Sequence, residues 1–208
     1  MSTSYFFVRV RLEPVVAGPV RSRRLGIREG RPNCNRKRRQ ILTARQREST
    51  RKLDSTTREL VSVACELSLP APLRAYQWEG VMFLTQNESA LLADEMGLGK
   101  TVQVAVALRV LLARRDCARV LIITPSSLRR NWMYELKRWA ALESCRFVEG
   151  DARNRTALYL LPFPVLIATY DQVRLDTGCL DTQELFDLVV LDEAQRIKNR
   201  ASITALAW

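Results

Sequence analysis

Residues 91–101 read LLADEMGLGKT, a short apolar run that passes into a glycine-spaced loop and ends in Lys-Thr. Gly97 and Gly99 lack the Cβ atoms that would keep backbone N–H groups away from phosphate oxygens, and the positive N-terminus of a following helix would face the same anion. Lys100 would reach the β and γ phosphates, and the hydroxyl of Thr101 would bind Mg²⁺. The stretch therefore predicts a nucleotide phosphate loop between a strand and a helix.

One residue of this loop departs from the general pattern G-x-x-x-x-G-K-[ST]. Asp94 stands where that pattern has its first glycine. An ordinary strand-to-helix turn would also explain a glycine-spaced loop after an apolar run, so the loop alone leaves two interpretations open.

Strand and helix patterns alternate over the rest of the chain. The run at 120–124 is apolar on both faces, rich in β-branched residues and ended by Pro125, which is typical of a central strand in a parallel sheet. The alternation predicts an α/β doubly wound, mostly parallel sheet, in which ligands bind at the carboxyl ends of the strands. The other predicted strands span 145–148, 164–169 and 188–191, and the predicted helices span 73–84, 101–112 and 152–160, with a further helix capped by Ser126 or Ser127.

Two carboxylates, Asp192 and Glu193, follow the last predicted strand. In this topology the end of that strand lies at the same edge of the sheet as Lys100 and Thr101. Asp192 suits a Mg²⁺ contact because a hard cation prefers oxygen ligands, and Glu193 suits a base or positioning group for an attacking water. Alone, the pair would simply mark the start of a helix, but together with the loop it predicts a site for a nucleoside triphosphate.

Charge is unevenly distributed along the chain. The 208 residues carry a net charge of +11, and residues 1–60 contain 16 Lys and Arg against 5 Asp and Glu, whereas residues 61–208 contain 17 of each kind. We predict a basic, disordered segment at 1–60 and one ordered domain at 61–208. Within the basic segment, residues 5–12 have the alternation of a short strand, and residues 36–53 have the composition of a basic helix that forms on a partner.

The basic run at 36–39 reads RKRR, and two interpretations of it are open. It is either an arm that binds nucleic acid, because clustered Lys and Arg release counterions from phosphate backbones, or a solvated leader without a specific role. No interleaved aromatic residues favour a surface that reads a base sequence.

Cysteine and histidine usage limits the class of protein. The chain has 5 cysteines with no C-x-x-C pair, and it has no histidine. This argues against a disulfide framework or a zinc site and for a reducing, cytoplasmic or nucleoid-associated setting. No apolar run approaches the roughly 18 residues of a membrane span, and no secretion signal is recognised. We therefore expect a protein that is not secreted and has no membrane partner.

Five motifs in order along the chain resemble those of the Swi/Snf-type ATPases, the double-stranded-DNA translocases of helicase superfamily two. The resemblance covers about residues 70–204. The motifs are LRAYQWEGV from residue 73, ADEMGLGKTVQ from 93, ITPSSL from 123 with Asn131-Trp132, ATY from 168 and LDEAQRIKN from 191. The string DEMGLGKT is highly specific to this branch, and it also explains Asp94, which is the residue expected in this family's loop.

The resemblance implies a RecA-like P-loop NTPase lobe that binds ATP and Mg²⁺. It implies that Gln77 reads adenine and that Asp192 and Glu193 serve the metal and the water. The implied nucleotide-binding residues are Gln77, Asp94, Gly97, Leu98, Gly99, Lys100 and Thr101, the implied metal ligands are Thr101 and Asp192, and the implied catalytic residues are Lys100, Asp192, Glu193 and Gln195. The motifs that face the DNA backbone in that family contain Ser126, Ser127, Thr169 and Tyr170, for which a helix cap or a strand end is the simpler interpretation.

Two departures from the family pattern affect these expectations. Gln195 replaces the more usual histidine; it can still form a hydrogen bond, so we expect altered coupling between nucleotide and DNA and intact binding. The lobe is expected to be incomplete at its C-terminus, because Trp208 comes before any Thr-Gly-Thr-Pro-like element or second RecA-like lobe. In the family that lobe supplies an arginine, which contributes on the order of 10³ to 10⁵ in rate in related phosphoryl transfers. We therefore expect ATP binding with poor hydrolysis, and an unpaired edge on the phosphate-loop strand.

Three functions are compatible with the sequence. The first is the ATP-binding lobe of a Swi/Snf-type ATPase that acts on double-stranded DNA and needs a second lobe for turnover. The second is a non-enzymatic protein that binds nucleic acid or a partner through the run at 36–39. The third is an enzyme of another superfamily-two branch, such as a restriction-type translocase, which the Asp-Glu-Met string at 94–96 makes less suitable.

Overall fold

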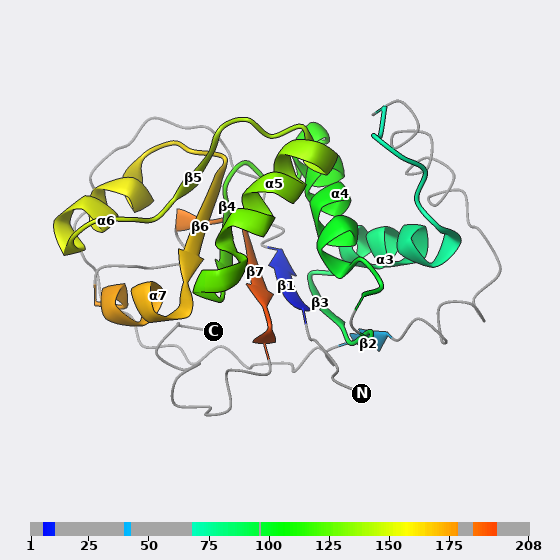
Figure 1. The fold of residues 1–208 in the computed structure, drawn as a ribbon, viewed down its shortest axis with the longest axis horizontal. Helices are drawn as coiled ribbons and strands as arrows, with labels where there is room; N and C mark the ends of the chain where they lie inside the picture. The colour runs from blue at the N-terminus through cyan, green and yellow to red at the C-terminus, as the bar shows by residue number, and fades with distance from the viewer. Residues whose placement is uncertain (1–5, 11–39, 43–67, 96, 179–184, 195–208) are drawn as a thin grey trace, which may run out of the picture.

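The computed structural model describes residues 6–10, 40–42, 68–95, 97–178 and 185–194, which form one sheet flanked by helices (Figure 1). The strands are β1 (Phe6–Val10), β2 (Gln40–Leu42), β3 (Ser89–Leu92), β4 (Val120–Thr124), β5 (Cys145–Phe147), β6 (Val165–Thr169) and β7 (Leu188–Asp192). The helices are α3 (Ala75–Gln86), α4 (Lys100–Ala113), α5 (Arg129–Ala140), α6 (Ala152–Leu160) and α7 (Tyr170–Asp176), with a 3₁₀ turn, η1 (Ser126–Leu128), before α5.

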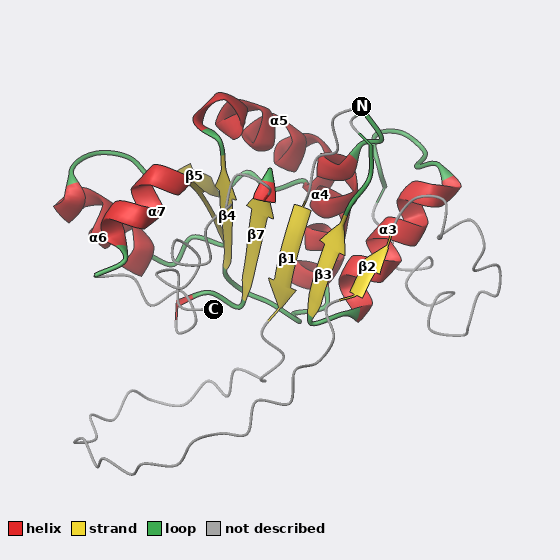
Figure 2. Cartoon of the chain, turned by 90° about the horizontal axis from the view of Figure 1, so that it is seen from below, coloured by secondary structure: helices red, strands yellow, loops and turns green. Residues whose placement is uncertain are grey.

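All of the described strands except β1 run in the same direction. Their order across the sheet is β2-β3-β1-β7-β4-β6-β5, and β1 is antiparallel to both of its neighbours (Figure 2). Val8 at the middle of β1 lies opposite Ala90 of β3 on one side and Val190 of β7 on the other. β1 therefore joins a two-stranded part of the sheet, β2 and β3, to a parallel part of four strands.

Alternate residues of the central strands face two hydrophobic cores on opposite sides of the sheet. On the first side, Ile122 of β4 packs in one cluster with Leu108 of α4 and Trp132 of α5. On the second side, Ile123 packs in another cluster with Tyr159 of α6. Every position of β4 is buried. The α/β fold with a mostly parallel sheet, expected from the apolar runs, is confirmed.

The predicted elements from residue 73 onward are found, with small shifts of their ends. The strand at 120–124 and the helix at 152–160 have the predicted bounds, whereas the first helix spans Ala75–Gln86. The predicted cap of α5 is wrong: Ser126 and Ser127 lie in η1, and neither η1 nor α5 has a side-chain cap. Helix α7 was not predicted.

The expectation of an unpaired edge on the phosphate-loop strand is also wrong. β3 pairs with β1 on one side and with β2 on the other. Backbone N–H and C=O groups in a buried sheet need partners, and β1 supplies them for β3. β1 also brings apolar side chains into the core, since Phe6 and Val8 are each 3% exposed. The expectation assumed that only a later segment of the chain could fill this position.

Eight residues of the N-terminal segment are described, and they belong to the sheet. The strand predicted within residues 5–12 is confirmed as β1. Residues 40–42 form β2 in this structure, where a helix was expected to form on a partner over 36–53. The helix on a partner stays a prediction. The run at 36–39 lies outside the described residues, and the division of the chain at residue 60 stays a prediction. In the part of the chain that is described, no helix has the length and apolar character needed to cross a membrane.

The central position of β1 leads to a stability prediction. We expect Val8→Asp to lower the free energy of unfolding by about 3 kcal/mol or more, because it places a carboxylate without a partner in the first hydrophobic core. Leu160→Asp is the control, since Leu160 is 66% exposed at the end of α6, and we expect it to change stability by about 0.5 kcal/mol or less. Urea denaturation measures both values. Equal effects of the two substitutions would contradict the placement of β1.

The two described cysteines allow a second prediction. Burial raises the pKa of the Cys117 thiol to about 12 and that of Cys145 to about 11. At pH 8 the folded chain therefore holds a smaller fraction of each as thiolate, the reactive form, than the unfolded chain does. We expect iodoacetamide to leave both unmodified in the folded protein and to alkylate both in guanidinium chloride, as read by peptide mass spectrometry. Rapid alkylation of either without denaturant would show that it is accessible.

Candidate functional site

The loop between β3 and α4 has the backbone geometry that its glycines predict. Gly97 has φ +87° and Gly99 has φ +70°, in the left-handed region where residues with a Cβ are strained. Gly99 is also the N-cap of α4, so the first turn of that helix starts directly from the loop. Thr101, a predicted metal ligand, lies in this first turn.

The side chain of Lys100 is folded against its own loop. Its ammonium group donates to the carbonyl oxygen of Asp94 at 2.9 Å and to that of Glu95 at 2.7 Å, and the residue is only 5% exposed. Asp94 is itself buried. A buried cation at the N-terminus of a helix is an arrangement suited to an anion such as a phosphate.

Gln103 in α4 forms a hydrogen bond to this loop. The sequence analysis gave this residue no role. The residue is fully buried, and its Nε2 donates to the carbonyl oxygen of Leu98 at 3.2 Å. Its backbone N–H donates to the carbonyl oxygen of Gly99. A polar residue among the apolar positions of α4 that follow the loop was the signal that could have found it.

Gln77, predicted to read adenine, lies against the phosphate loop. A Cβ built on Gly99 would come within 2.6 Å of the Nε2 atom of Gln77. The side-chain oxygen of Gln77 accepts from the backbone N–H of Arg74 at the start of α3, at 2.9 Å. The structure therefore brings Gln77 to the loop, while its role toward adenine stays a prediction.

Asp192 ends β7 at the same edge of the sheet. Both Leu92 of β3 and Asp192 lie opposite Phe6 of β1, so the two strand ends are level with each other across one intervening strand. With neighbouring strands spaced by about 4.8 Å, the two backbones are about 10 Å apart there. The phosphate loop begins directly after Leu92, which places the loop and the Asp192 carboxylate on one edge, as the sequence predicts.

The Asp192 carboxylate is buried and receives two side-chain hydrogen bonds. Its Oδ2 atom accepts from Thr124 Oγ1 at 2.8 Å and from Trp132 Nε1 at 2.8 Å, and the residue is 2% exposed. Burial raises the pKa of Asp192 above its ordinary value and the charge of Glu193 adds to this, while the bonds from Trp132 and Thr124 act in the opposite direction. Sequence reasoning placed Thr124 and Trp132 in motifs and gave neither of them a role toward Asp192.

The chain turns sharply after Asp192. Glu193 has φ +54°, an uncommon conformation for a residue with a side chain, and such conformations cluster at functional sites. The hydroxyl of Tyr170 donates to the carbonyl oxygen of Asp192 at 2.5 Å and so holds this turn from α7. Gln195 lies outside the described residues, so its predicted role stays a prediction.

The residues predicted to face DNA lie apart from the loop, on other elements of the sheet edge. The hydroxyl of Thr169 accepts from the backbone N–H of Gln172 and caps α7, as in the simpler interpretation of that residue. Ser126 and Ser127 are exposed in η1. They line a hollow of about 410 Å³ together with Arg129, Arg130, Phe147 and Glu149.

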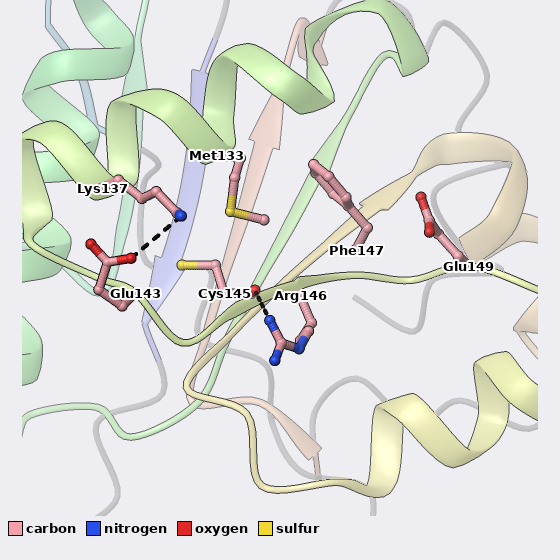
Figure 3. A pocket seen from close by; sticks show the side chains of 7 residues that line it. All are labelled: Met133, Lys137, Glu143, Cys145, Arg146, Phe147 and Glu149. Atoms are coloured by element: carbon pink, nitrogen blue, oxygen red, sulfur yellow. Dashed lines mark hydrogen bonds and ion pairs between the residues drawn. The ribbon is translucent and has the colours of Figure 1, made fainter.

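A second hollow, of about 350 Å³, lies between α5 and β5 (Figure 3). Its lining residues are Met133, Lys137, Glu143, Cys145, Arg146, Phe147 and Glu149, none of which belongs to the phosphate loop or to β7. Lys137 is paired with Glu143 at 3.3 Å across it. This hollow is therefore separate from the candidate nucleotide site.

The residues at the sheet edge fit a nucleotide with Mg²⁺. The loop offers backbone N–H groups at the start of α4 and the buried ammonium group of Lys100, and β7 offers a buried carboxylate. These are the donor and acceptor types that phosphates and a hard divalent cation require.

A comparison with known families supports the same conclusion, because the model of the SNF2-related domain matches residues 76–208. The chain belongs to this family. Among curated members, the ATP-dependent helicase BRM of Arabidopsis thaliana is 34% identical over 64% of this chain and 6% of its own length. An uncharacterized ATP-dependent helicase of Mycoplasma pneumoniae is 35% identical over 73% of this chain and 15% of its own length.

Another relative, the DNA repair and recombination protein RAD54-like of Mus musculus, is 32% identical over 69% of this chain and 22% of its own length. The SNF2-related chain described here thus spans less than a quarter of each of these relatives. A solved structure, the Sulfolobus solfataricus SWI2/SNF2 ATPase core in complex with dsDNA, matches 53% of this chain and 24% of that chain with a TM-score of 0.45 and 28% identity.

The two glycines of the SNF2-related loop provide a matched pair of substitutions. We expect Gly97→Ala to cost about 1 to 2 kcal/mol through its positive φ alone, since nothing lies within 4 Å of a Cβ at that position. We expect Gly99→Ala to cost more, because the new methyl group also displaces Gln77 from its bond to Arg74.

Thermal unfolding of both variants, with and without Gln77→Ala, measures the difference. We expect Gln77→Ala to remove the excess cost of Gly99→Ala. If the excess persists without the glutamine side chain, then Gln77 is not what excludes a side chain at Gly99.

Proposed function

We propose that this chain is the ATP-binding lobe of a DNA-dependent ATPase of the Swi/Snf type and that it binds Mg·ATP between the phosphate loop and Asp192. The observation that carries the proposal is the buried ammonium group of Lys100, held by loop carbonyl oxygens at the same sheet edge as the buried Asp192 carboxylate. An ammonium group and a carboxylate at one sheet edge are the groups that phosphate oxygens and a divalent cation would contact.

Each residue has a separate role in this proposal. Lys100 exchanges its contacts with the carbonyl oxygens of Asp94 and Glu95 for contacts with phosphate oxygens. Asp192 holds the metal, and Glu193 orients the water that attacks the terminal phosphate. Bound Mg²⁺ would neutralise charge on the β and γ phosphates.

We further propose that duplex DNA is the partner of this lobe. Relatives carry names such as "Chromodomain-helicase-DNA-binding protein 1-like" and "DNA repair and recombination protein RAD54-like". On this chain, the hollow at η1 combines the exposed Ser126, Ser127 and Arg130, which are hydrogen-bond donors of the kind that contact a phosphate backbone. Strand separation is not part of the proposal, because the resembled family moves along duplexes without necessarily unwinding them.

Turnover by these 208 residues alone is proposed to be slow. In the resembled family a second RecA-like lobe supplies the arginine that stabilises the charge of the transferred phosphate. The residues proposed here hold the nucleotide, the metal and the water, and they leave that contribution to a second lobe.

Nucleotide binding and phosphate release by the purified chain test the proposal. We expect Lys100→Ala to weaken Mg·ATP binding by about 10- to 100-fold, the cost of losing a hydrogen bond to a charged group. Lys137→Ala, which removes an exposed lysine from α5, is the matched control and should bind as the unaltered chain does. Isothermal titration calorimetry gives the affinities, and a phosphate-release assay with and without duplex DNA gives the turnover.

Each outcome has a definite meaning. Binding that depends on Lys100, with little phosphate release, supports an ATP-binding lobe that requires a second lobe. DNA-stimulated release that disappears in Lys100→Ala would contradict the proposed requirement for a second lobe. Absence of Mg·ATP binding by the folded, unaltered chain would contradict the proposal as a whole.

A further inference from the structure

The carboxylate of Asp192 is held on one oxygen by donors from two different elements. Thr124 at the end of β4 and Trp132 in α5 each donate to Oδ2 at 2.8 Å. Thr124 and Trp132 are both completely buried, so water cannot replace either donor. Two bonds to the same oxygen fix the rotation of the carboxylate, and therefore the position of Oδ1.

The indole of Trp132 is in turn held by apolar contacts. It lies in the first core cluster, and the ring of Phe6 in β1 packs against it with centroids 5.9 Å apart and an angle of 50° between the planes. A tryptophan has two side-chain torsions, and complete burial in this cluster leaves neither free. The N–H group is therefore aimed at Asp192 by the surrounding structure.

A second tryptophan on the same helix shows that this bond is specific. Trp139 is 7% exposed, and its Nε1 atom is buried with no hydrogen-bond partner among the described residues. A buried indole N–H without a partner costs free energy. Trp139 therefore shows that a tryptophan can be buried on α5 without having an acceptor for its N–H group. Of these two indoles, that of Trp132 is the one that donates to a carboxylate.

We propose that Thr124 and Trp132 are positioning residues, which hold the Asp192 carboxylate in the one rotation that binds the Mg²⁺ of a bound nucleotide. The inference rests on the proposed role of Asp192 as a metal ligand. Neutral donors suit this role, because they fix the carboxylate without supplying a positive charge that would compete with the cation. Groups that orient a metal ligand in this way commonly contribute 10- to 100-fold to metal affinity.

The test compares the Mg²⁺ requirement of ATP binding in matched variants. We expect Trp132→Phe to raise the Mg²⁺ concentration that gives half of the full ATP affinity by about tenfold, and to leave the weaker affinity measured in EDTA unchanged within about twofold. Trp139→Phe removes the N–H group that has no partner and should leave both values unchanged. Calorimetric titration of ATP at a series of Mg²⁺ concentrations measures them, and the melting temperature shows that each variant is folded.

Thr124 provides a second, independent pair of variants. Thr124→Val keeps the shape of the side chain and removes the donor, so we expect the same shift in Mg²⁺ requirement. Thr124→Ser keeps the hydroxyl and should restore the value of the unaltered chain. This pair decides the question if Trp132→Phe fails to fold.

The outcomes separate this inference from the proposed function. If the unaltered chain binds Mg·ATP through Lys100 and the Mg²⁺ requirement is unchanged in Thr124→Val and Trp132→Phe, the positioning role is wrong and the nucleotide site stands. If these variants lose ATP affinity equally in Mg²⁺ and in EDTA, they act on the fold of the site, and the positioning role is again wrong. If the unaltered chain binds no ATP, the proposed function fails first.

Discussion

Backbone pairing by the five residues of β1 joins the two parts of the sheet that carry the two sides of the candidate site. The phosphate loop follows β3, Asp192 ends β7, and β1 lies between these strands and pairs with both. The separation of the loop from the carboxylate is therefore set by the width of one strand. Phe6 adds a second connection, because its ring packs on the tryptophan that binds Asp192.

Two buried aspartates show how different donors lead to different roles. Asp176 is 3% exposed and accepts from the guanidinium group of Arg155 at 2.6 and 2.8 Å and from the hydroxyl of Tyr159 at 3.2 Å. Its charge is compensated inside the protein, and the ion pair ties α6 to α7. Asp192 is equally buried, but the side chains that donate to it are a hydroxyl and an indole, which carry no charge. A carboxylate held in this way keeps its capacity to bind a cation.

The parts of the fold that follow from local patterns were predictable from the sequence. The apolar run at 120–124 and the glycine-spaced loop before Lys100 are contiguous, and each specifies its own structure. The expected parallel topology then placed Asp192 at the same sheet edge as that loop. The bond from Trp132 to Asp192 could not be predicted, because it joins residues 60 positions apart and depends on the direction of a single N–H group.

The N-terminal region shows the limit of composition as a guide. A high density of Arg and Lys predicted a segment outside the domain, yet Phe6 and Val8 are buried in the core of the domain. Tertiary pairing overrode local character at 40–42 as well, where a basic, helix-like stretch contributes a strand to the edge of the sheet. Neither pairing can be recognised from the residues of β1 or β2 alone, because each of these strands pairs with strands that lie far away in the sequence.

The position of β1 also constrains how the chain can fold as it is made. Among the described strands, β1 is synthesised first and its partner β7 last. Pairing between such distant segments carries a large loop-closure cost and is slow to form. The backbone of β1 therefore stays unpaired on its β7 side until β7 has emerged. During that time the apolar side chains of Phe6 and Val8 are open to association with other chains.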